Sequence, residues 1–217
     1  MASARGVVAG GSVLAVGVMM AGFGGASAVA GQHVSFASLA PYIVREGEEA
    51  GFSAIGAPTF ISSAAAWTAG DPTAAADAKR LRGEGFRGGL TENTAGVNGA
   101  AGVSWVIELA SPAAAKSEEQ AQLKEDIATQ RPSPVTRFTI KQLPTSAGFT
   151  SRGNSRTEVN AGETPVAEVD ANVLFVEGSC VLLVGDQTGS RINPSPPVIG
   201  GALRIYGRTA HSGGVCT

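Results

Sequence analysis

Two apolar runs separated by a short polar turn stand out between Val173 and Asp186, in the stretch VLFVEGSCVLLVGD. Alternate side chains of a strand point to opposite faces of a sheet, and here both sets are apolar. The pattern predicts two strands joined by a tight turn near Glu177 and Gly178, at the centre of a sheet with both faces covered. Fourteen residues interrupted by a charge are too few to cross a bilayer, so the second face is covered by protein or by a ligand, and protein is the expectation.

Other segments alternate apolar with polar residues. This alternation occurs in residues 103–109 and 135–143, and it predicts half-buried strands of an antiparallel sheet that flank the central hairpin. Residues 57–67 carry a weaker strand pattern. Residues 88–102 and 145–168 are rich in Gly, Ser, Thr and Asn and are predicted to be loops.

Helix patterns occur in four segments. Residues 38–49 carry a short one, whereas the other three start with a polar N-cap residue followed by proline. The third has a thin apolar stripe, which predicts a surface helix with one buried edge, and the fourth has a strong stripe that predicts firm packing. The predicted starts are Asp71–Pro72, Ser111–Pro112 and Ser195–Pro196, the second segment stops at Gly83 or Gly85, and the stripe of the third consists of Ala113, Gln120, Leu123 and Ile127.

Residues 1–30 have the layout of a secretory signal peptide. Arg5 is followed by an uncharged stretch that is most apolar from Val13 to Met20, and residues 26–30 offer two A-x-A cleavage patterns. The alternative is a membrane anchor, but the strongly apolar part is well short of the roughly 20 residues that a spanning helix needs. Because no cysteine lies near the cleavage region, lipid attachment is not expected. We therefore expect residues 31–217 to form a single secreted α+β domain, located outside the cell or in its envelope.

Composition narrows the classes of function. Without residues 1–30 the chain keeps 15 basic and 18 acidic side chains, so no basic surface for nucleic acid or for an anionic membrane is indicated. With 43% hydrophobic and 16% charged residues the chain can form a core and is not expected to be disordered. No stretch after residue 31 is long and apolar enough to span a bilayer.

The chain has two cysteines, Cys180 and Cys216. In an exported protein an even number of cysteines indicates a disulfide, which here would tie the C-terminal tail to the central hairpin. The alternative is a pair of free buried thiols. Closing this loop would stabilise the folded chain by roughly 3–4 kcal/mol through loss of entropy in the unfolded state.

The order of elements resembles small secreted or lipid-anchored domains of high-GC actinobacteria. The matching residues are Gly85-Phe86-Arg87-Gly88, Leu143-Pro144 with Gly148-Phe149, and the stretch from Asn172 to Gly178. The resemblance implies an α+β sandwich in which an antiparallel sheet carries helices on its faces. It implies no catalytic residues, and this chain lacks the lipid-attachment cysteine that several such domains have.

Motifs for cofactors and metals are weak or missing in the sequence. The glycines of GEGFRGG fit G-x-G-x-x-G, but they close a helix rather than open one, which indicates a helix end and turn instead of a dinucleotide site. There is no P-loop. The histidines, His33 and His211, lie at opposite ends, and no H-x-x-x-H, C-x-x-C or calcium-loop pattern occurs, so no metal site and no cofactor is predicted.

Catalysis by a nucleophile or by paired acids receives little support. His211 is the one plausible histidine base, but it lies in a Gly-rich tail, and the predicted disulfide removes Cys216 as a nucleophile. Arg87, beside two glycines, is the candidate for an anion contact. The carboxylates considered for glycoside chemistry are Glu92, Glu108, Glu168, Asp170 and Glu177, and their spacing in sequence does not place any two together.

These observations favour a non-catalytic extracytoplasmic domain that binds a small apolar or amphipathic ligand or an envelope protein. One alternative is an extracellular hydrolase that uses His211 or Glu108. The other is a structural interaction protein of the cell envelope. No catalytic residue is assigned.

Overall fold

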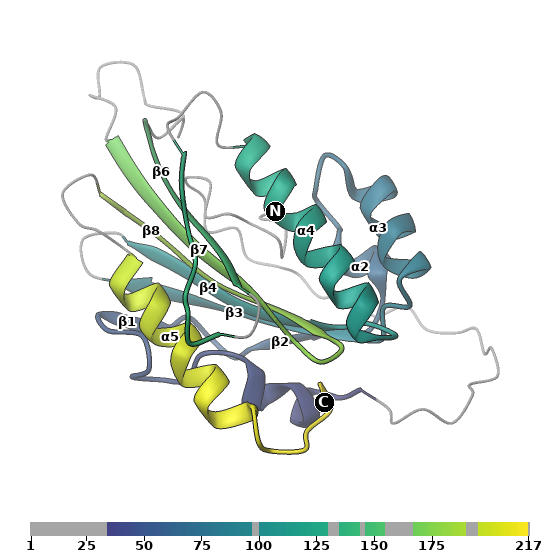
Figure 1. The fold of residues 1–217 in the computed structure, drawn as a ribbon. Helices are drawn as coiled ribbons and strands as arrows, with labels where there is room; N and C mark the ends of the chain where they lie inside the picture. Colours follow the sequence, from purple (N-terminus) through teal and green to yellow (C-terminus); the bar gives the residue numbers. More distant parts are fainter. Residues whose placement is uncertain are drawn as a thin grey trace.

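A single antiparallel sheet runs through the chain and carries helices on both faces (Figure 1). The computed structural model describes residues 34–96, 100–129, 135–143, 146–154, 167–189 and 195–216. The predicted signal peptide, residues 1–30, lies outside these ranges. No helix in the described ranges has the length and apolar character needed to cross a membrane.

The sheet has eight strands in the order β1-β3-β4-β8-β7-β6-β5, with β2 paired to β3 beside β1. All of the strand pairs are antiparallel. The strands are β1 (Phe52–Ala54), β2 (Thr59–Ile61), β3 (Gly88–Gly96), β4 (Ala101–Glu108), β5 (Val135–Phe138), β6 (Ser146–Asn154), β7 (Ala167–Glu177) and β8 (Cys180–Gly189).

The apolar hairpin predicted from VLFVEGSCVLLVGD is the β7–β8 pair at the middle of this sheet. Val173 pairs with Val184, Glu177 pairs with Cys180, and the turn consists of Gly178 and Ser179. Successive residues such as Leu182 and Leu183 point to opposite faces, and both are buried. The prediction of a central hairpin with two covered faces is therefore confirmed, and protein covers both faces.

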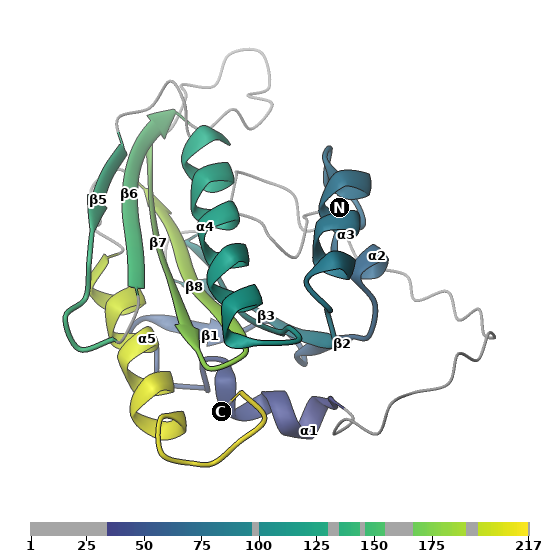
Figure 2. The ribbon, with the colours of Figure 1, turned by 45° about the vertical axis from the view of Figure 1, so that its right-hand side comes forward.

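The helices divide into two layers (Figures 1 and 2). One layer contains α5 together with the short α1 and the 3₁₀ helix η1, and the other contains α2, α3 and α4. The bounds are α1 (Phe36–Leu39), η1 (Ala40–Tyr42), α2 (Ala64–Trp67), α3 (Ala74–Gly83), α4 (Pro112–Thr129) and α5 (Ser195–Thr209).

The α5 layer covers the first face of the sheet. Val198, Ala202 and Ile205 recur at helical spacing and are buried against the face that carries Phe175 and Leu182. Arg208, in the last turn of α5, fixes the N-terminal segment: Nε donates to Pro41 O (2.9 Å), Nη2 donates to Ile43 O (2.7 Å), and Nη1 pairs with Glu48. The firm packing predicted for this helix is thus confirmed.

The second face is closed by aromatic side chains and by α4. Trp105 of β4 meets Trp67 of α2 edge to face, with ring centroids 5.8 Å apart, and Phe86 lies 6.1 Å from Trp67. In β4 every residue from Gly102 to Glu108 is buried, so the prediction of a half-buried strand at 103–109 is wrong. Both faces of β4 are covered because it lies beside the central hairpin, between two helix layers.

Two segments predicted as loops are strands. Residues 88–96 form β3 and residues 146–154 form β6, and β6 separates β5 from the hairpin, so the 135–143 segment does not flank it. The glycines that suggested loops are instead positions where aromatic rings pack closely against the backbone of a strand. A Cβ at Gly89 would collide with the Trp67 ring, and one at Gly148 would collide with the Phe138 ring, so these glycines accept an aromatic side chain rather than mark a turn.

The predicted helix boundaries are partly correct. α4 begins after Ser111, whose Oγ accepts from Ala114 N (3.2 Å), and α5 begins at Ser195, as expected. The N-cap prediction at Asp71 is wrong by two residues, because Asp71 Oδ1 instead accepts from Thr73 N (2.8 Å) in the turn before α3. The 38–49 segment is helical only as far as residue 42.

The predicted disulfide between Cys180 and Cys216 is present, with Cα atoms 5.2 Å apart. It joins the start of β8 to the C-terminal tail, and Ser179 N donates to Cys216 O (2.8 Å) beside it. Both cysteines are fully buried. The tail is therefore part of the core on the α5 side of the sheet.

Candidate functional site: the groove beside α4

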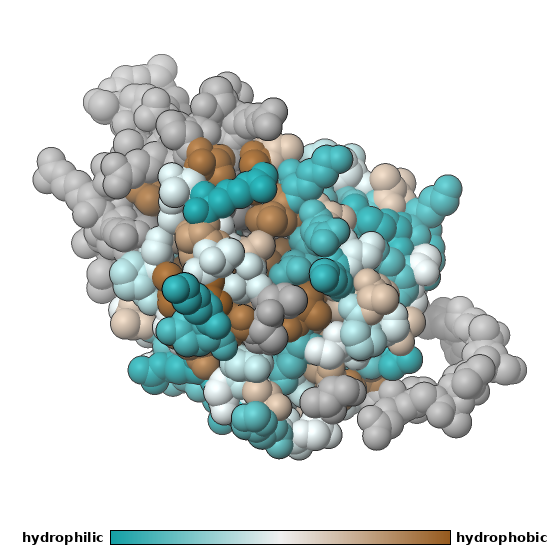
Figure 3. Space-filling view, viewed as in Figure 1, coloured by the Kyte–Doolittle hydropathy of each residue, from teal (hydrophilic) through white to brown (hydrophobic). Residues whose placement is uncertain are grey.

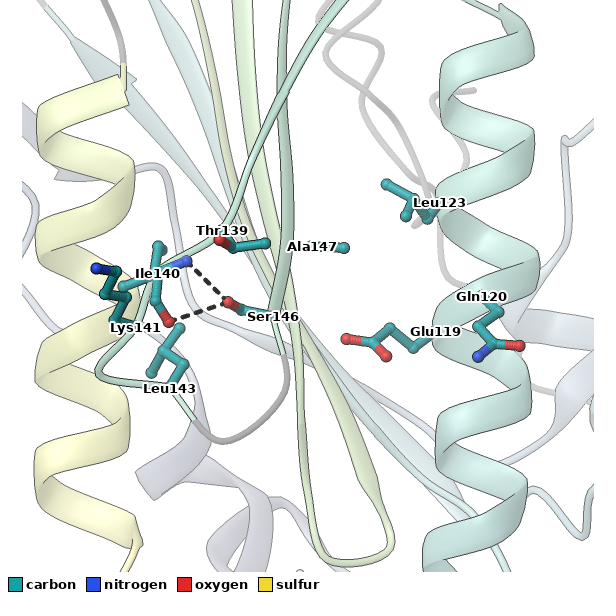
Figure 4. Close-up of a pocket in the computed structure, with 9 residues that line it drawn as sticks. All are labelled: Glu119, Gln120, Leu123, Thr139, Ile140, Lys141, Leu143, Ser146 and Ala147. Carbon is teal, nitrogen blue, oxygen red and sulfur yellow. Dashed lines mark hydrogen bonds between the residues drawn. The ribbon is translucent and has the colours of Figure 1, made fainter.

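A cavity of about 490 Å³ lies beside α4, on the side toward β5 and β6 (Figure 4). α4 packs against β7 and β8, and the cavity opens where this contact ends. We call it the α4 groove. Its lining residues are Glu119, Gln120, Leu123, Thr139, Ile140, Lys141, Leu143, Ser146 and Ala147.

Local hydrogen bonds hold the wall opposite α4. Ser146 Oγ accepts from Ile140 N (3.0 Å) and donates to Ile140 O (3.2 Å), which closes the connection between β5 and β6. Ala147 pairs with Leu174 across the β6–β7 ladder and therefore shares the face on which Leu174 packs, the face that α4 covers. The groove thus lies between α4, the start of β6 and the short connection after β5, which supplies Thr139, Ile140, Lys141 and Leu143.

The lining of the groove is divided almost equally between apolar and polar side chains. Leu123, Ile140, Leu143 and Ala147 provide the apolar surface, and brown hydrophobic side chains are visible between α4 and the β5–β6 side in Figure 3. Binding sites for small molecules commonly have volumes of roughly 300–1,000 Å³ and a mainly apolar lining with a few polar groups. The α4 groove has a volume in this range, but it is more open and more polar.

Glu119 is the buried acid of the groove. Its side chain extends from α4 toward β6 (Figure 4), and the residue is only 7% exposed. Oε1 is buried and has no hydrogen-bond partner. Burial raises the pKa of this carboxyl group, and the charge of Lys116 on the same helix lowers the pKa by a smaller amount.

The face of α4 that is buried is polar, unlike the predicted stripe. Ile127 is buried as expected and Leu123 is partly buried, but Ala113 and Gln120 are exposed, so that part of the prediction is wrong. The buried side chains of α4 are Ala115, Glu118, Glu119, Gln122, Asp126 and Ile127.

Arg80 of α3 explains part of this polar burial. Its guanidinium binds Glu118 through two hydrogen bonds, Nε to Oε2 (2.8 Å) and Nη2 to Oε1 (3.2 Å), and it also contacts Asp77 (2.6 Å). Gln122 Nε2 donates to Glu118 Oε1 (2.6 Å). Burial, together with the hydrogen bond and charge of Glu118, raises the pKa of Glu84 to about 7. The α3–α4 contact is therefore an ionic one.

One acidic cluster at this contact has the spacing of a cation site. Carboxylate oxygens of Asp71, Asp77 and Glu125 lie within 4.8 Å of one another. Thr73 Oγ1 lies among them, at 2.7 Å from Asp71, and Arg80 pairs with both Asp77 and Glu125. Because one guanidinium and one hydroxyl group already contact these acids, we assign the cluster to the α3–α4 contact.

Two of the carboxylates considered for catalysis flank the disulfide. Glu108 and Glu177 both pair with Cys180 in the sheet, one from each side. Arg87 Nη1 donates to Glu108 Oε1 (2.8 Å), and Thr209 Oγ1 donates to Glu177 Oε2 (2.5 Å). Burial raises the pKa of both acids. Neither carboxylate lines the α4 groove.

The predicted anion contact, Arg87, is 45% exposed in its side chain while it holds Glu108. Its role toward an external anion stays a prediction. His211 is exposed in the turn after α5, and Asp170 is buried on β7, whereas the side chain of Glu168 lies outside the described part of the structure. The hydrolase hypothesis built on His211 or Glu108 stays untested.

A buried pair of acids that the sequence did not reveal lies on the α5 face. Glu49 and Asp186 are 2% and 1% exposed, and Thr94 Oγ1 donates to Glu49 Oε2 (3.3 Å). Burial raises the pKa of both carboxyl groups, and the neighbouring Glu49 raises that of Asp186 further, so the pair retains a proton at neutral pH. Glu92 lies nearby, on a cavity of about 10 Å³ that Glu49 also lines.

The fold and the groove define an α+β domain with a central antiparallel sheet between two helix layers and a small-molecule-sized cavity beside the middle of α4. No protein-family model matches the sequence, and no curated protein matches it. The fold is similar to the crystal structure of the extracellular domain of PknH from Mycobacterium tuberculosis. The TM-score is 0.50 at 13% identity, over 81% of this chain and 98% of that chain, so the likeness concerns the fold alone.

Proposed function

We propose that this chain is a non-catalytic extracytoplasmic domain that binds a small amphipathic ligand in the α4 groove. The groove itself carries the proposal, because it joins apolar walls from Leu123, Ile140 and Leu143 to a buried acid in a volume of about 490 Å³. The central hairpin is not the ligand site, since protein side chains cover both of its faces.

The proposed location outside the cytoplasm rests on three observations. A disulfide such as Cys180–Cys216 persists in oxidising compartments. Residues 1–30 have the pattern of a signal peptide. The structural neighbour with a similar fold is itself an extracellular domain.

The test is to purify the exported protein under native conditions and to identify bound small molecules by mass spectrometry. Ala147→Phe fills the groove from β6, whereas Ala113→Phe adds the same side chain at an exposed position of α4 outside the groove. We expect the wild type and Ala113→Phe to carry the same amphipathic molecule and Ala147→Phe to lack it. Absence of a bound molecule from the wild type, or equal amounts in both variants, would contradict the proposal.

A further inference from the structure

The polar groups around the α4 groove are not equivalent. Ser146 already uses its hydroxyl group twice, as donor and as acceptor to Ile140. The ammonium group of Lys141 points away from the groove toward α5 in Figure 4. Glu119 is left as the charged side chain that reaches toward the opposite wall.

Glu119 lacks a compensating partner at Oε1. This oxygen is buried and accepts no hydrogen bond, and Lys116, one turn earlier on α4, acts on the carboxylate only through its charge. A buried carboxylate oxygen without a donor is costly, because it has lost its water without gaining a hydrogen bond. A donor supplied by a ligand would remove this cost.

The apolar side chains determine what must be attached to that donor. Leu123 lies one turn after Glu119 on α4, and Ala147 lies on the facing side of β6, whereas Ile140 and Leu143 lie beyond β6, where they also pack in the α5-side core. A ligand that places a cation at Glu119 therefore contacts apolar side chains with its remaining atoms.

Building on the proposed function, we infer that the α4 groove selects amphipathic organic cations, with Glu119 binding a protonated amine and Leu123, Ile140, Leu143 and Ala147 holding an apolar chain. Charge complementarity favours an amine over an alcohol, and it disfavours a carboxylate of the same length. Glu119 is a binding residue in this arrangement and takes part in no covalent step.

Octylamine, octanol and octanoate test this inference, because they share a chain and differ in head group. Isothermal titration of the full mature chain at pH 7 should give the tightest binding for octylamine and the weakest for octanoate. Glu119→Gln, which keeps the shape of the side chain, should weaken octylamine by about tenfold or more, as expected for a lost hydrogen bond to a charged group. The same substitution should change the affinity for octanol much less.

Lys141→Met is the matched control, since it removes a charge from the same groove without touching Glu119. It should leave the order of the three ligands unchanged. Two results would overturn the cation inference: equal affinities for octylamine and octanoate, or tighter binding of octanoate that Lys141→Met abolishes. In either case the groove would still bind a ligand, so the proposed function would stand. If none of the three compounds binds the wild type and no small molecule co-purifies, the proposed function fails as well.

Discussion

Many acidic side chains of this protein are buried, although the net charge of the chain is only −2. In the described ranges ten acidic residues are buried, whereas no lysine or arginine there is buried to the same degree. Fully buried acids are rare unless they are paired. The buried acids are Glu49, Asp77, Glu92, Glu108, Glu118, Glu119, Asp126, Asp170, Glu177 and Asp186.

Asp186 is the acid whose protonation should affect stability most clearly. Its folded-state pKa is raised, first by burial and then by Glu49, above the unfolded value of about 3.9. The resulting stability is complete below about pH 4 and is lost as the pH rises toward the folded-state pKa. Asp186→Asn should therefore be more stable than the wild type at pH 8, by at least about 1 kcal/mol, and less different at pH 5.

Urea unfolding between pH 4 and pH 9 measures this difference. Lys79→Gln is the control, because Lys79 is exposed on α3, on the opposite side of the sheet from Asp186, and the substitution should leave the pH profile of the wild type nearly unchanged. Parallel profiles for the wild type and Asp186→Asn would show that Asp186 is ionised in the folded protein across this range.

Among the elements, the α3–α4 contact depends on one arginine. Arg80 holds the fully buried Glu118, and removing one partner of a buried ion pair leaves the other without compensation. Arg80→Met should lower the free energy of unfolding by about 3 kcal/mol at pH 8.

Arg82 of the same helix is exposed and offers a matched control, so Arg82→Met should change stability by less than about 0.5 kcal/mol in the same urea titration. The double variant Arg80→Met/Glu118→Gln should recover part of the loss, since Glu118 then carries no buried charge and Asp77 is the buried acid that still lacks its arginine. Equal effects of the Arg80 and Arg82 substitutions would mean that the ion pair contributes nothing measurable.

The elements that the sequence predicts well are those with local patterns. The starts of α4 and α5 follow from Ser111 and Ser195, and the β7–β8 hairpin follows from apolar residues on both faces. β3 and β6 are missed because the rings that lie on Gly89 and Gly148 come from other elements, and no local pattern records them.

Less of the candidate site than of the fold can be predicted from the sequence. The stretch KSEEQAQ around Glu119 has the composition of an exposed helix surface. Burial of Glu118 depends on Arg80, 38 residues earlier, and the position of Glu119 depends on where β6 places Ala147. Sequence patterns indicated binding without catalysis, but the groove itself arises from contacts between distant segments.

Taken as a unit, the domain is held together at one end by Cys180–Cys216, which spans 36 residues. Replacing both cysteines by alanine should lower the free energy of unfolding by about 3–4 kcal/mol, because the unfolded chain regains the entropy of an open loop. Urea titration with and without dithiothreitol measures this effect: reductant should destabilise the wild type and leave Cys180→Ala/Cys216→Ala unchanged. A wild type unaffected by complete reduction would contradict this expectation.

The contacts of Arg208 impose an order of events on a chain that is synthesised from its N-terminus. Glu48 and Arg208 are separated by 160 residues, and the N-terminal carbonyls of Pro41 and Ile43 depend on the same guanidinium. The N-terminal segment therefore cannot form its contacts with Arg208 until α5 has been synthesised. Likewise, β4 cannot pair with β8 until β8 has been synthesised. Protection of residues 41–48 from proteolysis would accordingly mark chains whose synthesis is almost complete.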